Sequence, residues 1–304
     1  MKIQVLGSAA GGGFPQWNCN CFNCDGVRRG SIDAQPRTQS SIAITENAED
    51  WVLVNASPDL LAQIKSVPAL QPARAVRDSG IVAVLLMDAQ IDHVTGLLML
   101  RERGTPLPLY ATEEVMADLN HGLNIGRALG HYCGLDWQPI VPDQGDLQIA
   151  PLQRTRFTPI ALESKAPPYS PHRNDPHPGD NIGLKITNTQ SGRSAFYAPG
   201  LGEMTPAVTA AMSEADVLLV DGTFWSADEM IRLGLSAKTA ADMGHLPQSG
   251  PGGMMAVLER MPASRKILIH INNSNPILRE DSPERALLRQ RGIEVAFDGM
   301  EIEL

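Results

Sequence analysis

The chain has 304 residues, with 25 Lys and Arg against 34 Asp and Glu, which gives a formal net charge of −9. That length allows one large domain or two small ones. The acidic balance argues against nucleic acid as a partner, because neutralising phosphates needs Lys and Arg. No apolar run reaches the roughly 18 residues of a membrane helix, and the start lacks the apolar core of a signal peptide. We therefore expect a cytoplasmic protein with no membrane partner; the oligomeric state is left open.

Strands and helices alternate along the chain. Apolar runs bounded by turn residues predict strands, and apolar spacing of three and four predicts helices. The expected strands lie at 1–7, 41–57 (a hairpin), 81–87, 105–112, 183–188, 194–199, 215–224 and 265–272. The expected helices lie at 94–101 and 113–129. This alternation indicates an α/β fold with no clear boundary, so residues 1–304 are expected to form a single domain.

Two loops of the sequence bear on ligand binding. The Gly-rich segment 7–13 reads GSAAGGG, which matches neither a dinucleotide fingerprint nor a phosphate-binding loop, so we reject nucleotide binding. Residues 166–181 are rich in Pro and Gly and cannot form a helix. A loop of this length in a compact domain is often a lid or a binding loop, with a solvated surface loop as the alternative.

Three of the four cysteines, Cys19, Cys21 and Cys24, form the spacing C-x-C-x-x-C. In a cytosolic chain such spacing indicates a metal site, and thiolates at this density suit a structural Zn²⁺. An unmetallated or redox role is the alternative, and an iron–sulfur cluster would require a fourth cysteine. The fourth zinc ligand stays open between a histidine, Asp25 and a polar residue of the C-terminal strand loop.

A second polar cluster follows the apolar run 81–87. It contains Asp88, Gln90, Asp92 and His93, and the apolar segment 94–101 comes next. Asp92 and His93 are therefore expected at a strand-to-helix turn, where α/β proteins place ligands. The spacing resembles the His-x-His-x-Asp-His motif of the metallo-β-lactamase superfamily. Asp88 and Gln90 replace the two leading histidines, while Asp92 and His93 remain.

The superfamily resemblance gives a meaning to three further residues. His270 ends a predicted strand and resembles the last metal histidine of the superfamily, with a satisfied strand-end histidine as the alternative. His245 resembles the loop histidine that the phosphodiesterase branch places over its metals, although a lone loop histidine is equally compatible. Asp221 leaves another buried strand, where it could orient a ligand histidine or cap a turn. His172 and His177 are expected to be exposed in the long loop.

A narrower resemblance covers nearly the whole chain. It rests on segments in a fixed order: VLGSAAGGGFPQWNCNCFNC, MDAQIDHVTGLLMLR, YAPGLGE, VDGTFW, GHLPQSG and IHINNSNPIL. Together they are similar to a metallo-β-lactamase-like family that acts in pyrroloquinoline quinone (PQQ) biosynthesis. The resemblance implies an αββα four-layer sandwich. It also implies iron- and oxygen-dependent hydroxylation of a ring derived from tyrosine in a cross-linked Glu-Tyr intermediate.

The residues favour that chemistry over hydrolysis by two metals. A two-zinc hydrolase shares a water between its ions, but here the first site lacks its histidines. The bridging aspartate of the superfamily would fall near Ala198, Pro199 and Gly200. The remaining set, Asp92, His93 and His270, matches the two histidines and one carboxylate of non-haem Fe(II) oxygenases.

The sequence therefore predicts Fe(II) at Asp92, His93 and His270, with structural Zn(II) at the cysteines. His245 and Asp221 are expected to support catalysis, and the expected partner is a small peptide-derived substrate or PQQ itself. Two alternatives stay open: a mononuclear zinc hydrolase or peptidase, and a carrier that binds the finished quinone.

Overall fold

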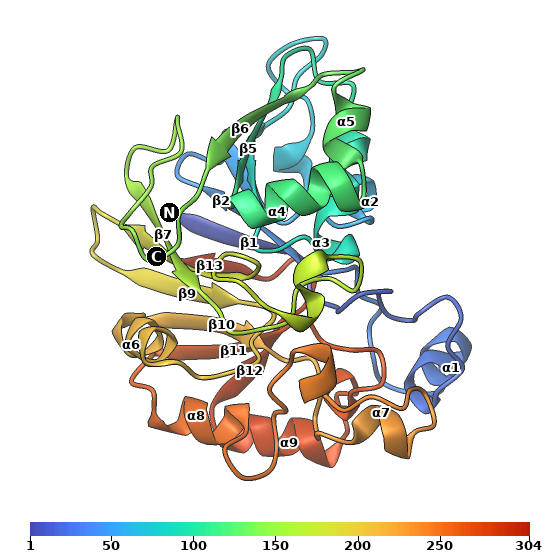
Figure 1. Cartoon of the computed structure of the whole chain (residues 1–304). Coiled ribbons are helices and arrows are strands. Elements are labelled where there is room, and N and C mark those ends of the chain that lie inside the picture. The colour runs from blue at the N-terminus through green and yellow to red at the C-terminus, as the bar shows by residue number, and fades with distance from the viewer.

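Two mixed sheets packed face to face form the centre of the protein, shown as a computed structural model that describes residues 1–304 (Figure 1). The first sheet has the order β13-β1-β2-β3-β4-β5-β6, and the second has the order β12-β11-β10-β9-β8-β7. The strands of the first sheet are β1 (Lys2–Gly7), β2 (Ser41–Thr45), β3 (Trp51–Val54), β4 (Ile81–Leu85), β5 (Leu107–Ala111), β6 (Leu135–Pro139) and β13 (Glu301–Glu303). Those of the second are β7 (Thr155–Ala161), β8 (Ile182–Asn188), β9 (Ser194–Ala198), β10 (Val217–Asp221), β11 (Arg265–Ile269) and β12 (Ile293–Val295).

Helices cover the outer face of each sheet. The helices along the first sheet are α2 (Leu60–Ser66), α4 (Glu113–Ala117) and α5 (Ile125–Leu129), and those along the second are α6 (Pro206–Glu214), α8 (Met254–Arg260) and α9 (Pro283–Gln290) (Figure 1). The shorter α3 (Ile91–Val94) lies between the two halves, while α1 (Phe22–Arg29) and α7 (Glu229–Arg232) lie together at one end. This arrangement confirms the expected αββα four-layer sandwich. No helix combines the length and apolar character needed to cross a membrane.

The alternation of side chains along the strands explains the layers. Val52, Val54 and Leu85 point into the core between the two sheets, whereas Leu53 and Val84 point outward under the helices of the first sheet. Strands covered on both faces are apolar throughout, which is why they are recognisable as continuous runs. The core between the sheets draws residues from both halves of the chain.

The expected strands are confirmed, and the hairpin at 41–57 is the antiparallel pair β2 and β3. The expectation of one continuous helix over 113–129 is wrong, because a π-helical turn at Asp118–Gly122 separates α4 from α5. Asn124 follows in the left-handed region, with φ of 56°. Most of the segment 94–101, Thr95–Leu100, forms a 3₁₀ helix rather than an α-helix. Gly96 lets this helix approach the strand end after β3, since a Cβ there would lie 2.1 Å from the carbonyl oxygen of Ser57.

Candidate metal centre

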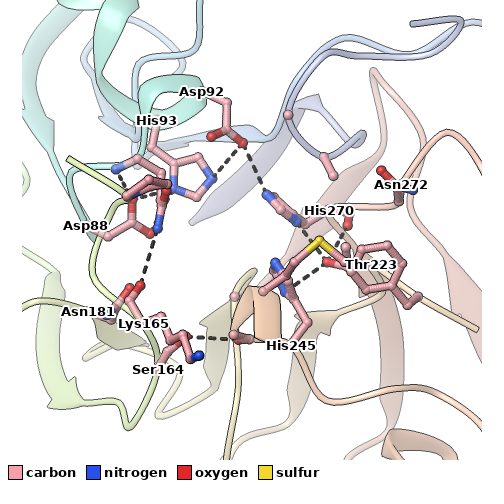
Figure 2. A pocket seen from close by; sticks show the side chains of 18 of the residues that line it. Asp88, Asp92, His93, Ser164, Lys165, Asn181, Thr223, His245, His270 and Asn272 are labelled. Carbon is pink, nitrogen blue, oxygen red and sulfur yellow. Dashed lines mark hydrogen bonds and ion pairs between the residues drawn. The ribbon is translucent and has the colours of Figure 1, made fainter. Parts of the chain in front are cut away.

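A pocket of about 260 Å³ opens at the edge of the sandwich where the ends of five strands meet (Figure 2). Its residues come from the segments that follow β1, β4, β9, β10 and β11, and from the long connection between β7 and β8. In α/β sheets the ends of strands present loop side chains to a common ligand. Residues nearly 180 positions apart in the sequence thus face one another.

Asp92, His93 and His270 lie at one side of this pocket with their ligand atoms within 4.8 Å of one another. Asp92 Oδ2 lies 3.4 Å from His270 Nε2 and 3.7 Å from His93 Nε2 (Figure 2). His93 Nε2 is buried and has no hydrogen-bond partner. An unpaired buried nitrogen is costly, and a metal ion would satisfy it. The donor set therefore fits a cation bound by two imidazoles and a carboxylate.

Asp88, which occupies a histidine position of the superfamily motif, turns away from this centre. Its two carboxylate oxygens lie 2.8 and 2.9 Å from His93 Nδ1. This contact places the imidazole proton on Nδ1 and leaves Nε2 to face a metal ion. The Gln90 amide donates instead to the Lys165 carbonyl at 3.3 Å. Asp88 therefore orients the imidazole of His93, and Gln90 holds the loop that contains Lys165.

The electrostatics of the cluster reflect its opposite charges. Burial by itself lowers the pKa of His93, but the carboxylates of Asp88 and Asp92 outweigh it and raise that pKa to about 9. Burial raises the pKa of Asp92, but the positive charges of His93 and His270 hold it well below its usual range. The pocket therefore keeps its carboxylate ionised, as a metal ligand must be.

Asp221 and His245 form a hydrogen-bonded pair beside His270, whose ring stacks on that of His245 at 5.4 Å, and the ligand atoms of these three residues also lie within 4.8 Å of one another (Figure 2). Asp221 Oδ2 accepts from His245 Nδ1 at 2.7 Å and from the Leu201 amide at 2.9 Å. Asp221 Oδ1 accepts from the amide and the hydroxyl of Thr223 at 2.9 and 2.6 Å. Four donors therefore occupy this fully buried carboxylate, which orients His245. Burial lowers the pKa of His245, yet Asp221 raises it above its usual value.

Thr223 connects this pair to the metal-binding cluster, and the sequence analysis did not single it out. Its hydroxyl proton goes to Asp221, so its oxygen accepts from His270 Nδ1 at 2.9 Å. Nε2 is then the ring nitrogen of His270 that faces Asp92, at 3.4 Å, and that could bind a metal ion. The backbone of His270 adopts the left-handed region, with φ of 61°, which is uncommon outside glycine and turns the side chain off the end of β11. Thr223 follows Asp221 by two residues at a strand end, and that spacing was the available signal.

Replacing Thr223 by valine should weaken metal binding at this centre by roughly 10- to 100-fold, the usual cost of losing an outer partner of a ligand histidine. Valine keeps the shape of the side chain but leaves His270 Nδ1 without its acceptor and removes one of the two donors to Asp221 Oδ1. The measurement is the Fe(II) dissociation constant by competition with a chelator. Thr223→Ser keeps the hydroxyl and should bind metal as tightly as the parent does. If Thr223→Val also bound metal as tightly as the parent, the hydroxyl of Thr223 would not orient His270.

The three cysteines Cys19, Cys21 and Cys24 form a second cluster, with sulfur atoms within 4.8 Å of one another. The side-chain amide of Asn273 lies 3.1, 3.7 and 3.3 Å from these three sulfurs. Asp25 is instead paired with Arg29 at 2.7 Å, and no histidine joins the cluster. Of the three candidates for a fourth ligand, the fold therefore brings only the polar residue of the C-terminal strand loop, Asn273, next to the cysteines.

The remaining histidines and the fourth cysteine lie outside both clusters. His172 Nδ1 pairs with Asp180 at 2.8 Å, and its ring stacks on His177, which is exposed as expected. Cys133 lies near the Leu100 carbonyl, at 3.8 Å. The long loop that contains His172 does line the pocket, through Pro168, Arg173 and Asn181, which favours a binding loop over a merely solvated one.

Comparisons with known proteins show the family of the chain. The beta-lactamase superfamily domain matches residues 50–271. Coenzyme PQQ synthesis protein B of Cupriavidus necator is 65% identical over 303 residues, covering 100% of this chain and 99% of the relative. The protein of the same name from Azoarcus sp. is 63% identical, with both chains fully covered. The crystal structure of Zn²⁺-bound PqqB from Methylobacterium extorquens is 38% identical, covers both chains fully and superposes with a TM-score of 0.90. With this identity along its whole length and this fold, the chain belongs to the PqqB (coenzyme PQQ synthesis protein B) family of the beta-lactamase superfamily.

Proposed function

We propose that the chain is an Fe(II)- and O₂-dependent hydroxylase of a tyrosine-derived, cross-linked Glu-Tyr intermediate in PQQ biosynthesis. Membership of the PqqB family supports the pathway. The observation that carries the chemistry is the cluster of Asp92, His93 and His270, in which a buried imidazole nitrogen has no partner. Two imidazoles and one carboxylate suit Fe(II) and leave about three positions of an octahedron for O₂ and substrate.

In this proposal Asp92, His93 and His270 hold the iron, which supplies the redox chemistry with O₂ when bound. One oxygen atom enters the ring, and two electrons from a reductant convert the other to water. His245 lies beside His270 with its Nδ1 held by Asp221, so its Nε2 is the atom that exchanges a proton with the substrate hydroxyl. Asp88 and Thr223 keep the two ligand imidazoles in the tautomers that bind metal.

We propose further that the cysteine cluster holds a structural zinc, with Asn273 as the fourth ligand. The amide oxygen and nitrogen of an asparagine are assigned from their contacts, and rotation of the amide would turn its oxygen to the three sulfurs. The M. extorquens relative binds Zn²⁺. That finding also favours the rival function, a mononuclear zinc hydrolase, because Zn²⁺ binds such N/O sites more tightly than Fe²⁺.

The test is anaerobic reconstitution with Fe(II), followed by ¹⁸O₂ and a cross-linked Glu-Tyr substrate with a reductant. The product should gain ¹⁸O from the gas, and protein loaded with zinc alone should be inert because Zn²⁺ has no redox chemistry. Turnover without oxygen would instead identify the zinc hydrolase or peptidase. Tight binding of PQQ with no turnover by the iron form would identify a carrier.

A further inference from the structure

The pocket that contains the candidate metal centre has an uneven distribution of charge. Its two carboxylates, Asp88 and Asp92, both contact the histidines of the cluster. Its three cations, Lys165, Arg173 and Lys238, come from other segments and contact none of those histidines. A concentration of positive charge at one pocket stands out in a chain whose net charge is −9.

None of these three cations is neutralised by an ion pair, although other basic residues of the chain are, as in the pair of Arg265 and Glu294 at 2.7 Å. The acidic side chain that Lys165 and Lys238 influence is Asp242. Its Oδ2 already accepts from the amide and the hydroxyl of Thr239 at 2.9 and 2.7 Å. Neither lysine ammonium forms an ion pair with a carboxylate, and Asp242 is the nearby acid whose pKa their charges lower.

Arg173 is held in place without losing its charge. Its guanidinium donates to the carbonyl oxygens of Ala166 at 2.7 Å and of Asp242 at 3.3 Å, so it ties two loops together through neutral acceptors. A guanidinium has five N–H donors, and the others stay available for a planar anion. Because its orientation is already fixed, little side-chain entropy is lost when a carboxylate binds.

The backbone that carries Lys165 is held by contacts on both sides. Its carbonyl accepts from Gln90, which follows β4, and the neighbouring Ser164 hydroxyl donates to the Gly244 carbonyl at 2.9 Å (Figure 2). Gly244 has a φ of 89°, and a Cβ there would lie 2.8 Å from the Ser164 hydroxyl. Glycine is therefore what lets the loop before His245 approach Lys165 so closely.

We propose that Lys165, Arg173 and Lys238 form a carboxylate-binding subsite, and that the ligand of the metal centre carries at least two carboxylates, one for Arg173 and one for Lys165. The inference rests on the proposed function for the identity of the site and adds the chemical class of its ligand. Only three of the 20 residues that line the pocket are hydrophobic, so a polar anion fits it better than an apolar ring. The subsite would hold the carboxylates while the rest of the ligand reaches Asp92, His93 and His270.

The experiment measures binding without turnover. Anaerobic, metal-loaded protein is titrated in a calorimeter with PQQ, a tricarboxylate, and with its uncharged trimethyl ester. The acid should bind at least 10-fold more tightly than the ester, and the difference should shrink at high salt. Lys165→Gln and Arg173→Gln should each weaken binding of the acid by roughly 10-fold, as for truncation of one partner of a positioned charge pair. Lys238 is exposed, so Lys238→Gln should weaken binding of the acid by a smaller factor than the other two substitutions.

Lys65→Gln is the matched control, since Lys65 is an exposed lysine of α2 outside the pocket. It should bind PQQ as the parent does. Lys165→Arg keeps the charge and should retain most of the affinity, which separates loss of charge from misfolding. Equal affinity for acid and ester, or unchanged affinity in both glutamine variants, would overturn the subsite. Hydroxylation with an unchanged KM in those variants would overturn the subsite alone, whereas charge-dependent binding with no ¹⁸O incorporation would overturn the hydroxylase alone.

Discussion

His93→Ala is expected to abolish Fe(II) binding at the pocket and to lower ¹⁸O incorporation at least 1,000-fold. The alanine removes the one buried imidazole nitrogen that no protein group satisfies, and it leaves Asp88 without the nitrogen that it orients. A single carboxylate and His270 cannot hold a divalent ion firmly, because each lost ligand removes a large share of the binding energy. Metal content and product should be measured on the same anaerobic sample.

Two controls make this result specific. His177→Ala removes an exposed histidine outside the cluster and should keep both iron and activity. The zinc content of His93→Ala should stay at about one ion per chain, because the cysteines lie in a separate cluster. If His93→Ala turned over normally, the assignment of Asp92, His93 and His270 as the iron ligands would be wrong.

Cys21→Ala should release the second metal and destabilise the fold by more than about 4 kcal/mol, as expected for loss of a structural metal. The three sulfurs hold the 16–24 segment against Asn273, which follows His270 by three residues. Loss of zinc should therefore also loosen the loop that carries His270. The measurements are zinc content after dialysis against a weak chelator and the midpoint of denaturant unfolding.

Cys133→Ala provides the matched substitution, because this cysteine lies apart from the cluster. It should keep the zinc and unfold at nearly the midpoint of the parent. In Cys21→Ala the Fe(II) affinity should fall as well, since His270 is a ligand of the other centre. Retention of zinc and an unchanged midpoint in Cys21→Ala would exclude a structural metal at these cysteines.

The sequence alone determined the fold class and the groups of residues that form the two centres. Strands covered on both faces are continuous apolar runs, so β4, β10 and β11 were visible, and polar residues at their ends pointed to Asp92, Asp221 and His270. The order of several motifs along the whole chain identified the family. The three cysteines lie within six residues of one another, so their pattern could be recognised without the tertiary structure.

Only the tertiary structure decided how these residues contact one another. Asp88 sits at a ligand position of the motif, yet its carboxylate faces His93 Nδ1, a choice made by side-chain orientation rather than spacing. Thr223 bonds His270 across 47 positions, and Asn273 reaches the cysteines across about 250. The split of the helix at 113–129 followed from a π turn and a left-handed Asn124. Contacts of this kind depend on packing between distant elements, and a local sequence pattern does not encode them.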